Sequence, residues 1–134
     1  MDTREELRQA IRRKDDAYRA GDIPGYLNAY APDISVYFAG SLITFEEIRR
    51  LIDEQFAGGG KILDYQIADP DRILFNADGD AATVSYPWRE RFRYGDGRVT
   101  DTEYYETNVW YRRDSKWRMV HLHLSTVAEH AVKA

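Results

Sequence analysis

The stretch from Tyr104 to Ser125 constrains the fold of this chain more than any other part of the sequence. It reads YYETNVWYRRDSKWRMVHLHLS, which predicts two long antiparallel strands joined by a turn at residues 113–115. Strand residues alternate between faces, so Tyr104, Glu106, Asn108 and Trp110 share one side, and Tyr105, Thr107, Val109 and Tyr111 share the other. Both sides are rich in aromatic and apolar side chains. One small domain usually covers only one face of a sheet, so a second copy of the chain is the expected cover for the other.

The composition predicts a single domain over residues 1–134 and excludes several classes of protein. Nineteen basic and 23 acidic residues give a net charge of −4, and the basic residues are scattered, which argues against nucleic-acid and membrane-surface binding. The chain has no cysteine, so thiolate metal sites and cysteine nucleophiles are excluded. Its charged start and the lack of a run of about 18 apolar residues predict a cytoplasmic protein without a membrane span.

Three helices are expected in the first 60 residues. A capping-box pattern opens a helix over 3–20, whose inner stripe holds Lys14 among apolar residues. A short helix over 22–31 follows, with Asp22 as its cap. A second capping-box pattern opens a helix over 44–57, which ends at a run of three glycines.

Strands and turns are expected from residue 61 onward, after a short strand at 33–38. The segment 61–76 is interrupted by Asp69-Pro70-Asp71, which predicts a bend or bulge on a sheet edge. The following strand places Val84, Tyr86, Trp88, Glu90 and Phe92 on one face. We expect residues 128–134 to form a loose tail.

Together these elements predict an α+β fold in which three N-terminal helices pack on a strongly bent, mainly antiparallel sheet, formed by a four-stranded meander. Such a sheet curls into a cone, and a small-molecule cavity would lie in its mouth. A three-residue loop over 95–97, with Gly97 left-handed, would set Tyr86 opposite Glu106 and Trp88 opposite Tyr104.

The register of the second hairpin remains open between two alternatives, because both two- and three-residue loops are compatible with residues 113–115. A three-residue loop places Val120, Leu122 and Leu124 beside Asn108 and sends both histidines, with Trp117 and Met119, to the opposite face. A two-residue loop reverses these faces.

The block ETNVWYRRDSKWRMVHLHLS over 106–125 closely resembles the end of the association (hub) domain of calcium/calmodulin-dependent protein kinase II, a nuclear transport factor 2-like domain. The segment 21–26, with Pro32 and Tyr37 after it, resembles the second helix and first strand of that domain. The chain is also similar to SnoaL-like and ketosteroid isomerase-like domains. The resemblance implies the cone fold, dimers built through the sheet, and a deep pocket lined by arginines.

The departures from that family concern the pocket. Trp88, Asn108 and Leu124 stand where the resemblance implies arginines, and Ile48 and Phe56 where it implies a histidine and a tryptophan. The anion-binding residues are therefore not carried over. Positions 108 and 124 should share the cavity face, which favours the three-residue loop.

The expected pocket combines carboxylates with aromatic walls. Its predicted lining consists of Tyr37, Phe56, Tyr86, Trp88, Glu90, Tyr104, Glu106, Asn108 and Leu124. Glu106, flanked by Tyr104 and Asn108, is the better-placed acid/base candidate, and Glu90 is the second, with Tyr86 as a hydrogen-bond donor. Burial raises a carboxyl pKa towards the range suited to proton transfer. The alternative for each is a satisfied structural hydrogen bond.

The opposite face is the expected oligomer interface. It consists of Tyr105, Thr107, Val109, Tyr111, Trp117, Met119, His121 and His123. The two histidines could chelate a metal in principle, but no third ligand has suitable spacing, so no metal site is predicted.

The sequence therefore favours a homo-oligomeric domain, dimeric or larger, that binds a small neutral or apolar molecule in its cone and for which no catalysis is indicated. One alternative is an isomerase, dehydratase or cyclase that uses a pocket carboxylate as base and needs no metal or organic cofactor. The other is an assembly scaffold without a ligand.

Overall fold

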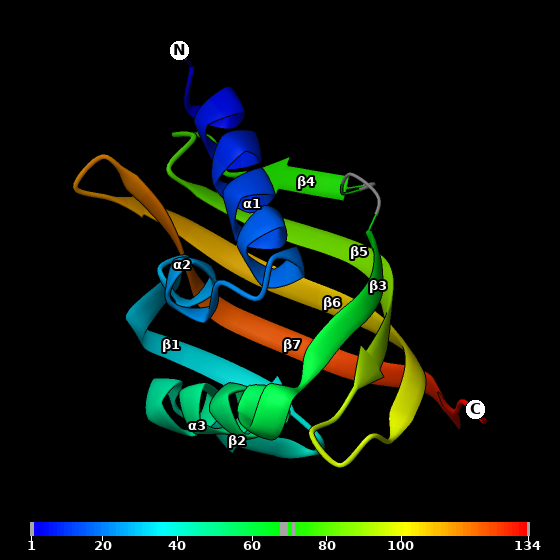
Figure 1. Ribbon diagram of the computed structural model, residues 1–134. Helices are drawn as coiled ribbons and strands as arrows, with labels where there is room; N and C mark the ends of the chain where they lie inside the picture. Colours follow the sequence, from blue (N-terminus) through cyan, green and yellow to red (C-terminus); the bar gives the residue numbers. More distant parts are fainter. Residues whose placement is uncertain (1, 68–69, 71, 134) are drawn as a thin grey trace.

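The computed structural model describes residues 2–67, 70 and 72–133. Three helices pack on one face of a curled seven-stranded sheet, and no helix formed by these residues covers its other face (Figure 1). The predicted α+β cone is confirmed. The elements are, in chain order, α1 (Thr3–Arg19), α2 (Ile23–Leu27), β1 (Tyr30–Phe38), β2 (Ser41–Ile43), α3 (Phe45–Phe56), the 3-10 turn η1 (Ala57–Gly59), β3 (Lys61–Ile67), β4 (Arg72–Phe75), β5 (Ala81–Arg93), β6 (Val99–Arg113) and β7 (Lys116–Ala131).

The sheet is larger than the predicted four-stranded meander. Its order is β2-β1-β7-β6-β5-β3, with β4 also paired to β5. Strand β1 runs parallel to β7, although the two are about 90 residues apart in sequence. A non-local pairing of this kind leaves no local pattern in the sequence, which is why β1 was not placed in the sheet.

Helix caps follow the sequence with one shift. Thr44 and Glu47 form the predicted capping box at the start of α3, and Asp22 accepts the Gly25 backbone N–H at 3.1 Å. The cap of α1 is Asp2, which accepts the Glu5 N–H at 2.9 Å, so the predicted box beginning at Thr3 is wrong by one residue. Helix α2 is also shorter than predicted, and Tyr30 begins β1.

Two further predictions concern the ends of strands. Strands β3 and β4 split the segment 61–76, and both pair with β5; of the predicted bend, Asp69 and Asp71 lie outside the described residues. The loose tail expected from residue 128 is wrong for 128–131, which continue β7 and pair with β6 up to Thr100. The Val132 N–H also donates to the Val99 carbonyl at 2.9 Å.

The β5–β6 hairpin has the predicted register. Tyr94 and Arg98 close a three-residue loop in which Gly97 has a φ of 92°. Tyr86 therefore pairs with Glu106, and Trp88 pairs with Tyr104. Glycine suits the left-handed position of such a loop, because a side chain there would be strained.

The β6–β7 hairpin combines features of both alternatives. Its loop has two residues, Asp114 and Ser115, with φ values of 51° and 65°. The predicted three-residue loop is therefore wrong. A bulge at Val120 then shifts the register, because Val109 pairs with His121 and Trp110 pairs with Met119.

The bulge divides the faces of β7. Beyond it, Leu122 and Leu124 lie on the inner face opposite Asn108 and Glu106, and both histidines lie on the outer face, as predicted. Before it, Trp117 and Met119 are buried in the core with Trp110. Their predicted place at the outer interface is therefore wrong, since the two-residue loop sets them on the helix-covered face.

Candidate functional site

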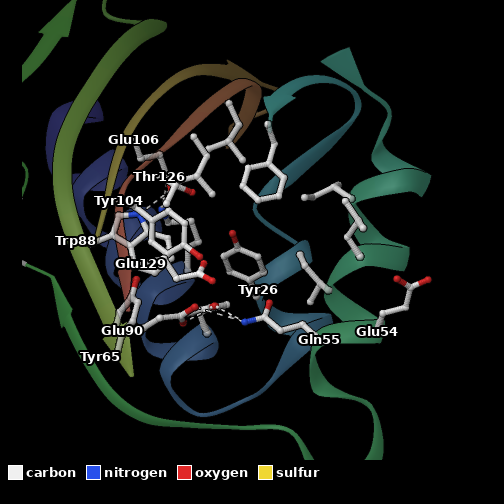
Figure 2. Close-up of a pocket in the computed structure, with 18 of the residues that line it drawn as sticks. Tyr26, Glu54, Gln55, Tyr65, Trp88, Glu90, Tyr104, Glu106, Thr126 and Glu129 are labelled. Atoms are coloured by element: carbon white, nitrogen blue, oxygen red, sulfur yellow. Dashed lines mark hydrogen bonds and ion pairs between the residues drawn. The ribbon is translucent and has the colours of Figure 1, made fainter. Parts of the chain in front are cut away.

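A cavity of about 480 Å³ opens between the inner face of the sheet and helices α1–α3 (Figure 2). Six of the nine residues expected to line a pocket border it: Tyr86, Trp88, Glu90, Tyr104, Glu106 and Leu124. Leu122, Ile48 and Ile52 add apolar surface to its walls. Trp88 and Leu124, which stand where the resemblance implies arginines, bring no charge to it.

The other three expected pocket residues lie elsewhere. Asn108 is fully buried beneath the cavity, and Phe56 packs edge-on against Tyr18 and Phe92. Tyr37 is on the outer face, where its ring meets that of His123 with centroids 5.0 Å apart. The alternation of β1 explains the last case, because Val36 and Phe38 take the inner positions.

The floor of the cavity is a buried ion pair. Lys14 projects from α1 with 4% of its side chain exposed, and its Nζ lies 3.6 Å from Glu106 Oε2 and 3.3 Å from Asp15 Oδ1. Lys14 Nζ also donates to the Tyr86 hydroxyl at 2.7 Å, and that hydroxyl donates in turn to Glu106. Three side chains from α1, β5 and β6 therefore form one connected unit.

Neutral donors complete the shell of Glu106. Trp88 Nε1 donates to Oε1 at 3.1 Å, and Asn108 Nδ2 donates to Oε2 at 2.6 Å. Asn108 is itself oriented by Trp110 Nε1, which donates to Oδ1 at 2.7 Å. Both carboxylate oxygens therefore accept at least one hydrogen bond from a neutral donor.

The charges on the floor shift the pKa values of its members. Burial acts to lower the pKa of Lys14, but the carboxylates of Glu106 and Asp15 outweigh it, and the net shift is upward. Burial raises the pKa of Tyr86, and the adjacent Glu106 charge raises it further. The lysine therefore stays cationic and the tyrosine stays protonated at neutral pH.

Sequence reasoning placed Lys14 in the inner stripe of the first helix but assigned it no role. The available signal was a lysine at a core position between Ile11 and Tyr18, because a buried cation requires an anionic partner. Glu106 and Glu90 were the carboxylates already expected on the inner face. The pattern could have suggested a pair, but it could not have chosen between them.

Glu90 occupies a different environment on the same wall. It is 6% exposed and accepts hydrogen bonds from the Tyr18 hydroxyl at 2.8 Å and from Gln55 Nε2 at 3.4 Å (Figure 2). Burial raises the pKa of Glu90 to about 7, although both hydrogen bonds act to lower it. At neutral pH this carboxyl therefore exchanges its proton readily, which suits acid/base chemistry.

Aromatic rings form the wall around Glu90. Trp88 and Tyr104 are stacked with centroids 4.3 Å apart and an interplanar angle of 28°. The rings of Tyr18 and Tyr65 approach Trp88 with centroids at 5.9 and 5.6 Å. A flat apolar or aromatic molecule would find several ring faces and edges in this part of the cavity.

The outer face carries charged side chains and both histidines, and Arg91 on β5 forms an ion pair there with Asp101 on β6 at 2.8 Å. His121 Nδ1 shares a hydrogen bond with Ser35 Oγ at 2.7 Å, and His123 Nε2 shares one with Ser125 Oγ at 3.3 Å. Within the described part of the chain, no group of three or more histidine, aspartate or glutamate side chains is arranged to hold a metal ion. None of its described helices has both the length and the apolar character to cross a membrane.

Comparison with known proteins places this geometry in a family. Residues 7–129 match the model of the SnoaL-like domain. The chain is 32% identical over 123 residues to the delta subunit of calcium/calmodulin-dependent protein kinase type II from Oryctolagus cuniculus, which covers 90% of this chain and 22% of the kinase. It is 25% identical over 130 residues to the alpha chain from Drosophila melanogaster, covering 94% of this chain and 24% of that protein. The chain thus spans about a quarter of the length of these kinases.

The solved structures agree on the fold. A ketosteroid isomerase-like protein from Erwinia carotovora atroseptica SCRI1043 superposes with a TM-score of 0.74 at 17% identity, covering 92% of this chain and 95% of that one. The resemblance inferred from residues 106–125 is confirmed by the kinase matches. By its family model and its cone of helices on a curled sheet, the chain belongs to the SnoaL-like domain family, with the nuclear transport factor 2-like fold.

Proposed function

We propose that this chain binds a small molecule with a largely apolar body in the cone cavity, as one subunit of a homo-oligomer. The observation that carries the proposal is the cavity itself. Its volume of about 480 Å³ is within the range of small-molecule sites. Its walls offer aromatic rings, and the polar groups of its floor are already paired with each other, so an apolar body would leave few buried groups unsatisfied.

Native mass spectrometry of the purified protein tests the proposal, since a retained molecule appears as added mass that is lost on denaturation. Replacement of Leu124 by Trp should fill part of the cavity and remove the added mass. Val127→Trp is the matched control, because this side chain on the same strand is 64% exposed and does not border the cavity. Equal retention by both variants would place the molecule outside the cone.

Self-association is supported by the uncovered outer face of the sheet. Tyr105 and Tyr111 are 48% and 41% exposed there, and Val109 lies between them. Exposed aromatic surface of this extent is typical of interaction faces. The similarity to an association domain of calcium/calmodulin-dependent protein kinase II agrees with a homodimer or a larger ring.

Light scattering can test the interface. Val109→Arg places a charge at the centre of this face and should yield a folded monomer. Ala20→Arg adds the same charge at an exposed position after α1 and should leave the oligomer intact. A Val109→Arg protein with unchanged mass would assign the interface to another surface.

A second candidate function is proton-transfer catalysis, an isomerisation, dehydration or cyclisation. The observation that favours it is Glu90, a cavity carboxyl whose pKa of about 7 suits a general base. Glu106 is less suited because it is paired with the Lys14 cation and also accepts hydrogen bonds from Tyr86, Asn108 and Trp88. Turnover found in a metabolite screen and abolished by Glu90→Gln, but not by Glu103→Gln on the outer face, would support an enzyme.

A further inference from the structure

Two carboxylates line the same end of the cavity, the buried Glu90 and the exposed Glu129. Glu90 on β5 pairs with Thr102 on β6, and Thr102 pairs with Glu129 on β7, so the three residues form a row across adjacent strands. Two strand spacings separate the backbones of the two glutamates by about 10 Å. Both side chains border the cavity, and Figure 2 shows them on the side of Trp88 and Tyr104.

The rings between these carboxylates suit a positive charge. Aromatic faces carry negative electrostatic potential and attract cations within about 6 Å of the ring centroid. The cavity already shows two such contacts, because the Arg98 guanidinium lies over the Tyr94 ring at 4.3 Å and Lys14 Nζ lies over the Tyr86 ring at 5.2 Å. The stacked pair of Trp88 and Tyr104 lies beside Glu90 and offers further ring surface.

The charges lining the cavity are unbalanced. Four carboxylates and two cationic side chains border it. Lys14 is engaged with Glu106 and Asp15, while Glu54 lies 4.0 Å from Arg50 and points away from the cavity in Figure 2. Among the described residues, neither Glu90 nor Glu129 has a cationic side chain within 4.0 Å. Two acidic groups at one end of an aromatic cavity are therefore open to an external cation.

We propose that the ligand of this cavity is an organic cation, an amine or quaternary ammonium with an apolar body. Its charged group lies between Glu90 and Glu129, against the rings of Trp88 and Tyr104. Its body extends towards Phe38, Ile52 and Leu124. This inference rests on the proposed binding function and replaces the neutral ligand expected from sequence.

The site couples cation binding to a proton. The charged groups that share the cavity with Glu90 are Lys14 on α1, Glu54 on α3, Glu106 on β6, Glu129 on β7 and Arg98 in the loop before β6. The tyrosines next to Glu90 are Tyr18 on α1, Tyr65 on β3 and Tyr104 on β6. Burial raises the pKa values of the three tyrosines, and the net pKa shift of Lys14 is also upward, so these groups keep their protons at neutral pH. Glu90, with its pKa of about 7, is the group that changes charge there.

A bound cation favours the ionised carboxylate, so binding lowers the pKa of Glu90 and releases its proton. Affinity should therefore be highest above pH 7 and fall as the pH drops below 7. A neutral ligand of the same shape gains nothing from ionisation of Glu90. The direction of the pH dependence thus distinguishes a cationic from a neutral ligand.

The test compares benzyltrimethylammonium with its uncharged carbon isostere, neopentylbenzene, by following the Trp88 indole N–H signal in NMR titrations. We expect the cation to bind about tenfold more tightly at pH 8. Its affinity should fall about tenfold between pH 8 and pH 6. Glu90→Gln should abolish this pH dependence, and both Glu90→Gln and Glu129→Gln should weaken the cation several-fold. Glu103→Gln removes an outer-face charge on β6 and should change neither the pH dependence nor the affinity for the cation.

The outcomes separate this inference from the broader proposal. If neopentylbenzene binds as tightly as the cation, the cationic assignment is overturned while small-molecule binding in the cone stands. If the cation binds but Glu90→Gln and Glu129→Gln behave like Glu103→Gln, the cation does not use this site, and the assignment is again overturned. If neither probe perturbs Trp88, both the assignment and the cone as a binding site are contradicted.

Discussion

Glu106 and Glu90 lie on the same inner face of adjacent strands, and both are about 95% buried, yet their surroundings differ. Glu106 has a lysine 3.6 Å away and three neutral donors. Glu90 has two neutral donors, Tyr18 and Gln55, and no cation close by among the described residues. Burial alone therefore does not assign a role to a carboxylate.

The difference shows that the charge of the neighbouring groups determines whether a buried carboxylate has a structural role or can change its protonation state. The Lys14 cation offsets the loss of hydration at Glu106, so this glutamate has a structural role in the floor of the cavity. Neutral donors offset it only in part, so the pKa of Glu90 rises to about 7 and its charge can respond to pH or to a ligand. The following variants are chosen to break or sharpen this contrast.

The largest effect is expected from Lys14→Met. Removal of the cation leaves Glu106 buried without its counter-charge, and breaking such a pair costs about 3–5 kcal/mol in the free energy of unfolding. Urea denaturation at pH 7.5 measures the loss. Arg13→Met, an exposed neighbour on the same helix, is the control and should change stability by less than about 0.5 kcal/mol.

A double variant sharpens this result. Lys14→Met combined with Glu106→Gln removes both charges and should recover part of the lost stability, because no uncompensated charge then remains. If Lys14→Met alone lowers the free energy of unfolding by about 1 kcal/mol or less, the Lys14–Glu106 pair is not essential for stability.

An intermediate effect is expected from Glu90→Gln, visible as a change in how stability depends on pH. The folded pKa of Glu90 lies above the ordinary value of 4.5, so the folded state holds the proton more tightly than the unfolded state. The stability that Glu90 contributes is therefore present below pH 4.5 and is lost as the pH rises through 7, by about 3 kcal/mol in total.

The Glu90→Gln variant has no ionisable group at this position and does not lose this stability as the pH rises. Its free energy of unfolding relative to the wild type should therefore increase by about 3 kcal/mol between pH 4.5 and pH 8. Chemical denaturation at a series of pH values measures the difference. Glu103→Gln is the control for an exposed carboxylate. Parallel pH curves for the wild type and Glu90→Gln would show that Glu90 ionises as an ordinary surface group.

The smallest effect is expected from Tyr18→Phe, which removes the hydroxyl that donates to Glu90 at 2.8 Å. That hydrogen bond acts to lower the pKa of Glu90, so its removal should raise the pKa of Glu90 above 7. The variant should also lose about 1 kcal/mol of stability at pH 8. Carbon-13 NMR titration of the Glu90 carboxyl measures the pKa. Tyr26→Phe removes a hydroxyl that pairs with Tyr30 instead and should leave the titration unchanged; an equal shift in both variants would point to a general change in packing.

The contrast itself was only partly predictable. The glycine-containing loop at 95–97 predicted the β5–β6 register correctly, and this register places Tyr86 beside Glu106. Both glutamates were therefore expected in the cavity. The prediction preferred Glu106 as the acid/base group, whereas the surroundings favour Glu90, since the lysine that pairs with Glu106 arrives from a helix 92 residues earlier in the chain.

The second hairpin shows a different limit. The resemblance indicated that Asn108 and Leu124 share the inner side, and they do, but the inferred loop length was wrong. A bulge at Val120 compensates for the two-residue turn. Bulges arise from the fit of a strand to both neighbours, here β6 and β1, and leave little trace in the sequence of the strand itself.

By itself, the sequence determined the fold class, the helix caps at Asp22 and Thr44, and the alternation that separates an inner from an outer face on β5 and β6. These features follow from contacts within a few residues or within one hairpin. Only the tertiary structure decided which buried carboxylate receives a cation, which side Trp117 and Met119 take, and that Glu129 joins Glu90 across the sheet. Those outcomes depend on side chains brought together from distant elements, because electrostatics and packing act through space rather than along the chain.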